Sequence, residues 1–189
     1  KDWQKQVLHF AGGSTLGDQQ EFQGYLNAMK DTIETVNFGG NVTTYKKTSS
    51  DPLDPNQIAD LSERLENGVS IMNFFGHASS NGFEINVDEP SNWNNTGKYP
   101  LIIGNACYTG DIFQNYNSFS EKFVLIPQEG AIAFLSTVRM GFGFSLDRYT
   151  NQLYRQISKL NYGATLGYQM KANIAMTRNL YGDNIYMET

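Results

Sequence analysis

Short apolar runs and longer stretches with helical spacing alternate along this chain. The first run, at residues 7–11, ends at Gly12-Gly13 and predicts a buried strand followed by a turn. Asp18 and Glu21, three positions apart, predict the capped start of a helix that extends to about residue 36. The apolar residues of this helix recur every three or four positions: Phe22, Leu26, Met29 and Ile33.

The same alternation continues to the end of the chain. Further strands are predicted at 41–45, 69–75, 101–106 and 131–138, and further helices at 54–67, 118–127, 146–160 and 164–180. Strands that alternate with helices are typical of an α/β fold with a mainly parallel sheet. Several runs are apolar on both faces, which indicates strands covered by helices on each side. The polar stretch 79–98 is predicted to be a loop, and we expect a single domain over 1–189.

Composition narrows the class of protein. An apolar fraction of 40% and a charged fraction of 17% over 189 residues are typical of a folded soluble domain. The net charge of −5 argues against a nucleic-acid partner, because binding phosphates needs concentrated Lys and Arg. No apolar run approaches the roughly 20 residues of a membrane span. The chain starts at Lys1 rather than at a methionine, so we expect a fragment of a longer protein whose other domains are its partners.

Reactive side chains are few. Cys107 is the single cysteine, which excludes an internal disulfide, and His9 and His77 are the two histidines. His77 follows the predicted strand 69–75, and Cys107 follows the predicted strand 101–106.

These two strand ends predict a site. In an open α/β sheet, ligands bind beyond the carboxyl ends of the strands. If the two strands are parallel neighbours about 4.8 Å apart, the thiol and the imidazole lie within reach of each other. Such a pair supports nucleophilic catalysis, because the thiolate attacks while the imidazole moves the proton. Taken singly, a cysteine or histidine at a strand end is usually a packed structural residue, so placement alone leaves a structural interpretation open.

Two segments around these residues resemble the gingipain family of cysteine peptidases, peptidase family C25. Residues 71–79, Ile-Met-Asn-Phe-Phe-Gly-His-Ala-Ser, are similar to the strand followed by Gly-His-Gly in that family. Residues 101–111, Leu-Ile-Ile-Gly-Asn-Ala-Cys-Tyr-Thr-Gly-Asp, resemble its apolar strand that ends in Ala-Cys or Ser-Cys, with Gly-Asp soon after. Within the family, the chain is most similar to the sortase-like, PorU-type peptidases of Bacteroidetes type IX secretion. The resemblance covers about residues 69–145 well and the first 68 residues by element order alone.

This resemblance implies a caspase-like fold, a three-layer sandwich whose mainly parallel central sheet is flanked by helices. It implies Cys107 as the nucleophile and His77 as the general base and acid. The backbone N–H groups of Cys107 and Ala78 would hold the oxyanion, and Ser136-Thr137-Val138 would line the substrate groove as an extended segment.

The implied activity is that of a cysteine endopeptidase or a sortase-like transpeptidase acting on exported protein or peptide substrates. Its place would be outside the cytoplasm, at the bacterial cell surface or in secreted form. The family usually has Gly after the histidine, where this chain has Ala78. If that position needs a positive φ, alanine fits poorly there. A catalytically degenerate caspase-like domain that binds peptides or braces a secretion assembly is therefore the alternative hypothesis.

Several charged residues have open roles. Asp18 or Glu84 is a candidate third group that orients the imidazole, although a solvated loop acid is the ordinary interpretation of each. At the substrate residue before the scissile bond, Asp18, Asp111 and Asp147 would favour a basic side chain and Arg139 an acidic one.

We expect no catalytic cofactor or metal, because one cysteine and two histidines are too few for a zinc site of the usual kind. Asp88, Glu89 and neighbouring Asn residues suggest a structural calcium ion, which gingipain-like enzymes often bind. Their spacing matches no defined calcium loop.

Overall fold

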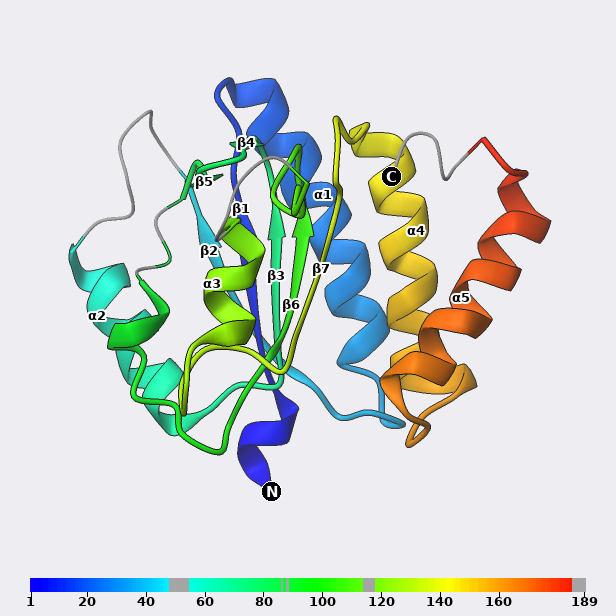
Figure 1. The fold of residues 1–189 in the computed structure, drawn as a ribbon. Helices are drawn as coiled ribbons and strands as arrows, with labels where there is room; N and C mark the ends of the chain where they lie inside the picture. The colour runs from blue at the N-terminus through cyan, green and yellow to red at the C-terminus, as the bar shows by residue number, and fades with distance from the viewer. Residues whose placement is uncertain (48–54, 86, 88, 114–117, 185–189) are drawn as a thin grey trace.

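The computed structural model describes residues 1–47, 55–85, 87, 89–113 and 118–184. A five-stranded sheet with the order β2-β1-β3-β6-β7 forms its centre (Figure 1). Its strands are β1 (Gln6–Ala11), β2 (Asn41–Lys46), β3 (Ile71–Phe75), β6 (Leu101–Asn105) and β7 (Ala133–Ser136). Every neighbouring pair is parallel, so all five carboxyl ends meet at one edge. The predicted α/β fold with a mainly parallel sheet is confirmed.

Helices cover both faces of the sheet, which makes the domain a three-layer sandwich (Figure 1). One face is covered by α1 (Leu16–Ile33), α4 (Gly143–Arg155), a π-helical turn (Gln156–Leu160) and α5 (Leu166–Tyr181). The other face is covered by α2 (Pro55–Asn67) and α3 (Phe119–Leu125). Because both faces are buried, the central strands are apolar at nearly every position.

Side chains of β1 show how the two cores divide. Val7 and Ala11 pack with α1 and α4, whereas Leu8 and Phe10 pack with α2 and α3. This alternation follows from the two-residue period of a strand. His9 also points to the α1 side, and it is fully buried.

A buried polar network crosses the α1 side of the sheet. The Tyr154 hydroxyl lies 2.9 Å from Nε2 of His9 and accepts from Nδ2 of Asn73 at 3.0 Å. Nδ2 of Asn105 donates to Oδ1 of Asn73 at 2.8 Å, and Thr150 donates to Oδ1 of Asn105 at 2.6 Å. The network therefore ties β1, β3 and β6 to α4, and it ends two residues before Cys107.

Three details of the predicted elements need correction. Helix α1 begins at Leu16 with Thr15 as its N-cap, and Asp18 is the third helical residue of the capping box rather than the cap itself. Strands β3 and β7 are shorter than the apolar runs that predicted them. The predicted helix 146–160 begins at Gly143 and changes to a π-helical turn after Arg155.

The stretch 79–98 is not a plain loop. It contains most of a small antiparallel hairpin, β4 (Ala78–Ser79) with β5 (Gly82–Phe83), and a 3-10 turn (Pro90–Asn92). Strands of two residues are too short to show a hydrophobic periodicity, so the sequence did not predict this hairpin. This hairpin directly follows His77.

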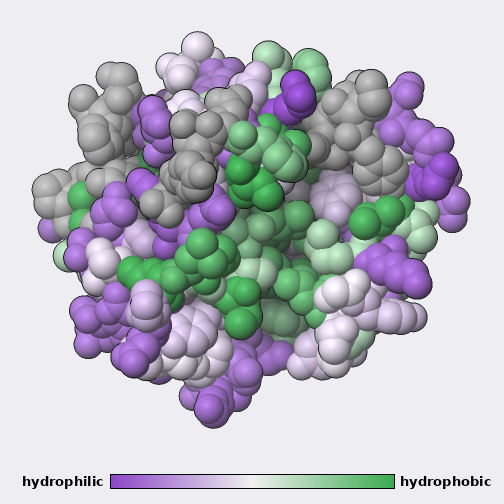
Figure 2. All heavy atoms as spheres, viewed as in Figure 1, coloured by the Kyte–Doolittle hydropathy of each residue, from purple (hydrophilic) through white to green (hydrophobic). Residues whose placement is uncertain are grey.

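Strand β7 is the last strand in the order of the sheet. Hydrophobic residues gather near the middle of the face that Figure 2 shows, where β7 lies in Figure 1. A hollow of about 560 Å³ lies between β7 and the helices α4 and α5. Apolar side chains in its lining include Ile103, Leu135, Leu146 and Ile174.

Candidate active site

His77 and Cys107 occupy equivalent places on neighbouring strands. β3 and β6 are parallel and hydrogen-bonded, and Phe75 lies opposite Asn105. His77 comes two residues after Phe75, and Cys107 comes two residues after Asn105. The expectation of adjacent parallel strands is thus confirmed, and both residues follow the carboxyl edge of the sheet. The His77 side chain is 53% exposed, and Cys107 is partly buried.

The segment after Cys107 is held against the segment after β7. The N–H of Tyr108, a residue with φ of +62°, donates to the Arg139 carbonyl at 2.8 Å. The N–H of Gly110 donates to the Thr137 carbonyl, also at 2.8 Å. The Cys107 sulfur lies 3.7 Å from the Gly141 carbonyl oxygen. The thiol therefore lies beside the stretch that connects β7 to α4.

Residues 136–138, predicted to line a substrate groove, differ in how far their side chains are buried. The Thr137 side chain is buried, and its hydroxyl is shared between the carbonyls of Ala106 (2.5 Å) and Arg139 (2.9 Å). Val138 is 43% exposed. The strand ends at Ser136 and residues 138–139 form a bend, so the extended segment predicted over 136–138 is shorter than expected. The Ser136 hydroxyl is buried and has no hydrogen-bond partner among the described residues.

Asp18 is the acid that contacts the His77 ring. Its Oδ2 lies 3.4 Å from Nε2 of the imidazole, and the ring packs edge-on against Phe22. The Thr15 N–H donates to the same Oδ2 at 3.0 Å, within the capping box of α1. Contacts with Thr15 first, and with His77 second, lower the pKa of the Asp18 carboxyl below its ordinary value. Asp18 therefore presents a negative charge to the ring at neutral pH.

Glu84 binds the backbone of His77 rather than its ring. Oε1 of Glu84 accepts from the N–H groups of His77 and Gly13, both at 2.7 Å. Oε2 accepts from Nζ of Lys47 at 3.0 Å. The Glu84 side chain is only 12% exposed, so it is not a solvated loop acid. Gly13 and Lys47 lie far from Glu84 in the sequence and His77 lies seven residues away, and no local pattern indicates these contacts.

The hairpin determines where the Ala78 N–H points. In an antiparallel pair, hydrogen-bonded and non-hydrogen-bonded residue pairs alternate. The Glu84 N–H donates to the His77 carbonyl at 3.1 Å, so the next pair, Ala78 with Phe83, is of the non-hydrogen-bonded kind. The Ala78 N–H is therefore turned away from β5, toward the outside of the hairpin.

Alanine is compatible with the backbone at position 78. Among the described residues other than glycine, a positive φ occurs at Asn94, Tyr108 and Gln128 and not at Ala78. The expected conflict between alanine and this backbone position is therefore absent from the structure.

The acids considered for substrate preference lie in different surroundings. Asp111 is buried, and its Oδ1 accepts from the Phe113 N–H at 3.2 Å. Asp147 lies on α4 and accepts from Nδ2 of Asn151 at 2.6 Å. Partial burial raises the pKa of the Asp147 carboxyl. Arg139 is exposed. The preference predicted from these residues stays a prediction.

The calcium prediction depends on Asp88, which lies outside the described residues. The described part of the chain has no group of three or more His, Cys, Asp or Glu side chains arranged to hold a metal ion. In the same residues, no helix combines the length and apolarity that crossing a bilayer requires.

Parallel strands that bring a thiol and an imidazole to one edge of a three-layer α/β sandwich define a caspase-like domain. The chain belongs to peptidase family C25, because the family model matches residues 1–188. No curated protein sequence matched it.

Solved structures of the same fold include two of gingipain R (RgpB). The first is of the Arg-specific cysteine proteinase itself, with a TM-score of 0.73 and 17% identity over 97% of this chain and 44% of that one. The second is a complex of Porphyromonas gingivalis RgpB pro- and mature domains, with a TM-score of 0.74 and 17% identity over 98% and 45%. A third, described as a protease, has a TM-score of 0.61 and 20% identity over 85% and 33%. The chain thus spans less than half of each of these proteins.

Proposed function

We propose that this domain is a cysteine peptidase in which Cys107 is the nucleophile and His77 the general base and acid. The observation that carries the proposal is that each of the two residues comes two positions after the end of its strand, and the two strands are adjacent and parallel. Asp18 would be the third group, because its carboxylate lies beside Nε2 of His77. Such a carboxylate stabilises the imidazolium that forms when the ring takes up a proton.

In this mechanism the Cys107 thiolate attacks the carbonyl carbon of a peptide bond. The outward N–H of Ala78 and the N–H of Cys107 would hold the negative oxygen that develops there. His77 then protonates the leaving amine as the C–N bond breaks, and the acyl group remains on sulfur as a thioester. Water hydrolyses the thioester in an endopeptidase, whereas an incoming amine takes the acyl group in a sortase-like transpeptidase.

The proposed substrates are exported proteins or peptides, and the proposed place of action is outside the cytoplasm. The place of β7 as the outer strand of the sheet, beside the cysteine loop, supports a polypeptide substrate, because an extended peptide can pair with an outer strand. Further domains of the parent protein would complete the substrate groove.

The non-cleaving alternative depended on Ala78. Since the backbone there suits alanine and its N–H points away from the hairpin, that feature does not favour the alternative. The retained thiol and imidazole favour the peptidase.

Thiol alkylation with iodoacetamide across pH tests the pair. In the wild-type chain, we expect rapid labelling of Cys107 well below the free-cysteine pKa of about 8.5. His77→Ala should lose that reactivity, whereas Asn81→Ala, a change at an exposed turn residue of the same hairpin, should keep it. Equal labelling profiles for the wild type and His77→Ala would refute the dyad.

A second assay separates the two reactions. A library of peptides is incubated with the wild type and with Cys107→Ser, with and without a primary amine. Cleaved acids indicate hydrolysis and amide products indicate transpeptidation, and both should be absent with Cys107→Ser.

A further inference from the structure

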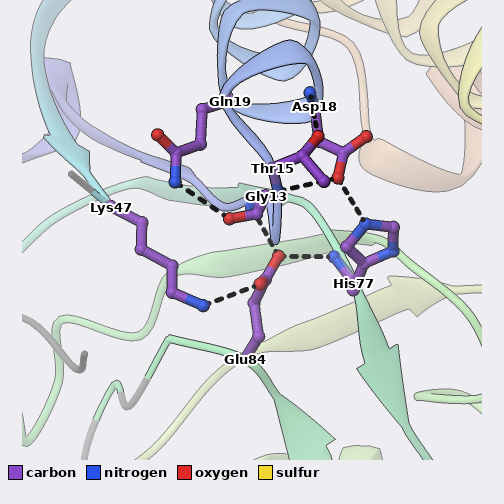
Figure 3. Close-up of polar contacts among 7 residues, drawn as sticks. All are labelled: Gly13, Thr15, Asp18, Gln19, Lys47, His77 and Glu84. Carbon is purple, nitrogen blue, oxygen red and sulfur yellow. Dashed lines mark hydrogen bonds and ion pairs between the residues drawn. The ribbon is translucent and has the colours of Figure 1, made fainter. Parts of the chain in front are cut away.

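A largely buried ion pair lies behind the candidate active site, where three segments at the carboxyl edge of the sheet meet (Figure 3). Glu84 binds the turn after β1 through Gly13, the residue after β2 through Lys47, and the residue before β4 through His77. The Glu84 and Lys47 side chains are 12% and 10% exposed. A carboxylate with two backbone N–H donors and an ammonium partner has good compensation for its loss of water.

The surrounding sequence leaves room for this carboxylate. A Cβ atom at Gly12 or at Gly76 would overlap with Oε1 of Glu84. Neither of these glycines has a φ in the positive range, so space rather than backbone conformation requires glycine at both positions. Gly12 and Gly76, which follow different strands, thus leave the space that the Glu84 carboxylate occupies.

Glu84 holds His77 at two backbone points. Its carboxylate accepts from the His77 N–H, and its own N–H donates to the His77 carbonyl at 3.1 Å. With both peptide groups bonded, the backbone of His77 has little freedom to rotate. The direction in which the imidazole leaves the backbone is therefore determined by Glu84.

The same carboxylate also holds the segment that carries Asp18. Oε1 binds the Gly13 N–H, and Nε2 of Gln19 donates to the Gly13 carbonyl at 3.1 Å. Two residues after Gly13, Thr15 caps α1 and binds Asp18. One oxygen atom thus restrains the segments that carry both members of the contact between Asp18 and the imidazole.

We propose that Glu84, neutralised by Lys47, is a positioning residue that fixes the His77 imidazole against Asp18 and toward Cys107. This role deepens the proposed peptidase function and rests on it. Catalytic groups must be held within about 0.5 Å and 10–20° of their productive geometry. A displacement of about 1 Å costs about 100-fold in rate.

The first test is Glu84→Gln, which keeps the size of the side chain and removes its charge. Its amide nitrogen must then face either the Lys47 ammonium or a backbone N–H, and donor facing donor is repulsive. We expect alkylation of Cys107 at neutral pH to slow at least 10-fold and its pH profile to move toward that of His77→Ala. The double variant Glu84→Gln/Lys47→Met should recover much of the rate, since the buried cation is removed.

Glu34→Gln is the matched control. Glu34 also accepts from a backbone N–H, that of Val42 at 2.9 Å, and also pairs with a lysine, Lys30, at 3.8 Å. It lies at the opposite end of the sheet. All variants are measured in buffer where urea titrations show them to be folded. A purely structural role of Glu84 would lower the unfolding midpoint and leave the pH profile of the folded protein unchanged, and that result would overturn the proposal.

The NMR titration of the His77 ring gives a readout that does not depend on catalysis. Asp18→Asn should shift the Hε1 resonance of the His77 ring when it is introduced into the wild-type chain. The same substitution should leave that resonance unchanged when it is introduced into Glu84→Gln. If the wild type shows no activation of Cys107 by His77, the peptidase proposal fails, while this titration still decides whether Glu84 positions the ring. If activation is present and Glu84→Gln keeps both profiles, the positioning role alone is wrong.

Discussion

His9 makes the stability of this fold fall at acidic pH. Its ring is fully buried on the α1 side of the sheet, and Nε2 lies 2.9 Å from the Tyr154 hydroxyl. Burial, and then the positive charge of Lys30, lower the pKa of His9 from 6.5 to about 3. The folded chain therefore holds this histidine neutral where the unfolded chain takes up a proton.

The sign and size follow from linkage. Above pH 6.5 both states are neutral at His9, and its contribution to stability is fully present. As the pH falls below 6.5, the unfolded state binds the proton first, and the free energy of unfolding drops by about 1.4 kcal/mol per pH unit. At pH 4.5 the loss from this residue reaches about 2.7 kcal/mol. That is a large share of the 5–15 kcal/mol, approximately, that stabilises an ordinary domain.

Urea unfolding at pH 7.5 and pH 4.5 measures this loss. His9→Gln stays neutral at both pH values and retains an amide for the Tyr154 hydroxyl, so its stability should fall between them by about 2.7 kcal/mol less than that of the wild type. Asn81→Ala, which changes an exposed turn residue without a titrating group, should retain the wild-type difference. An equal pH dependence in the wild type and His9→Gln would refute the inference that the buried ring stays neutral.

Two further substitutions test buried hydrogen bonds. Thr137→Val removes the hydroxyl that donates to the Ala106 carbonyl, so we expect the free energy of unfolding in urea to fall by about 1–2 kcal/mol. Cys107 follows Ala106 directly, so its alkylation should also become slower. An unchanged alkylation rate would contradict a role for Thr137 in placing the thiol. Asn95 accepts from the Gly130 N–H at 3.0 Å and donates to the Gly130 carbonyl at 2.8 Å, both buried contacts. Asn95→Ala leaves both peptide groups unpaired and should cost about 2–3 kcal/mol, and a loss well below 1 kcal/mol would show that water replaces the side chain.

Hydrophobic periodicity was sufficient to predict the layers of this fold. The buried strands 71–75 and 101–105 are apolar apart from Asn73 and Asn105, and helix α1 buries the four residues that its spacing predicted. The limits of the elements were less predictable. Ile58 shares the helical spacing of Leu61 and Leu65 in α2, yet it is 36% exposed while the two leucines are buried.

The site was predictable only in part, for a physical reason. His77 and Cys107 stand out in the sequence because each follows an apolar run. The carboxylate of Glu84 binds peptide groups 71 residues away at Gly13 and seven residues away at His77. Backbone donors have no sequence signature, and a carboxylate in a polar stretch is ordinarily solvated. Asp18 and Glu84 were equal candidates for orienting the imidazole, and only the location of α1 shows that Asp18 is the one that contacts the ring.

The short hairpin after His77 places a constraint on length rather than on composition. Residues 80–81 form a turn between Ser79 and Gly82, and many polar pairs would serve there equally well. One added residue, however, would have to be absorbed by a longer loop, by a bulge, or by turning one of the two strands over. If β4 turned over, the Ala78 N–H would face β5 instead of the outside of the hairpin, without any change in Cys107 or His77. The length of this two-residue turn therefore bears on the direction of the Ala78 N–H, independently of the residues that carry the thiol and the imidazole.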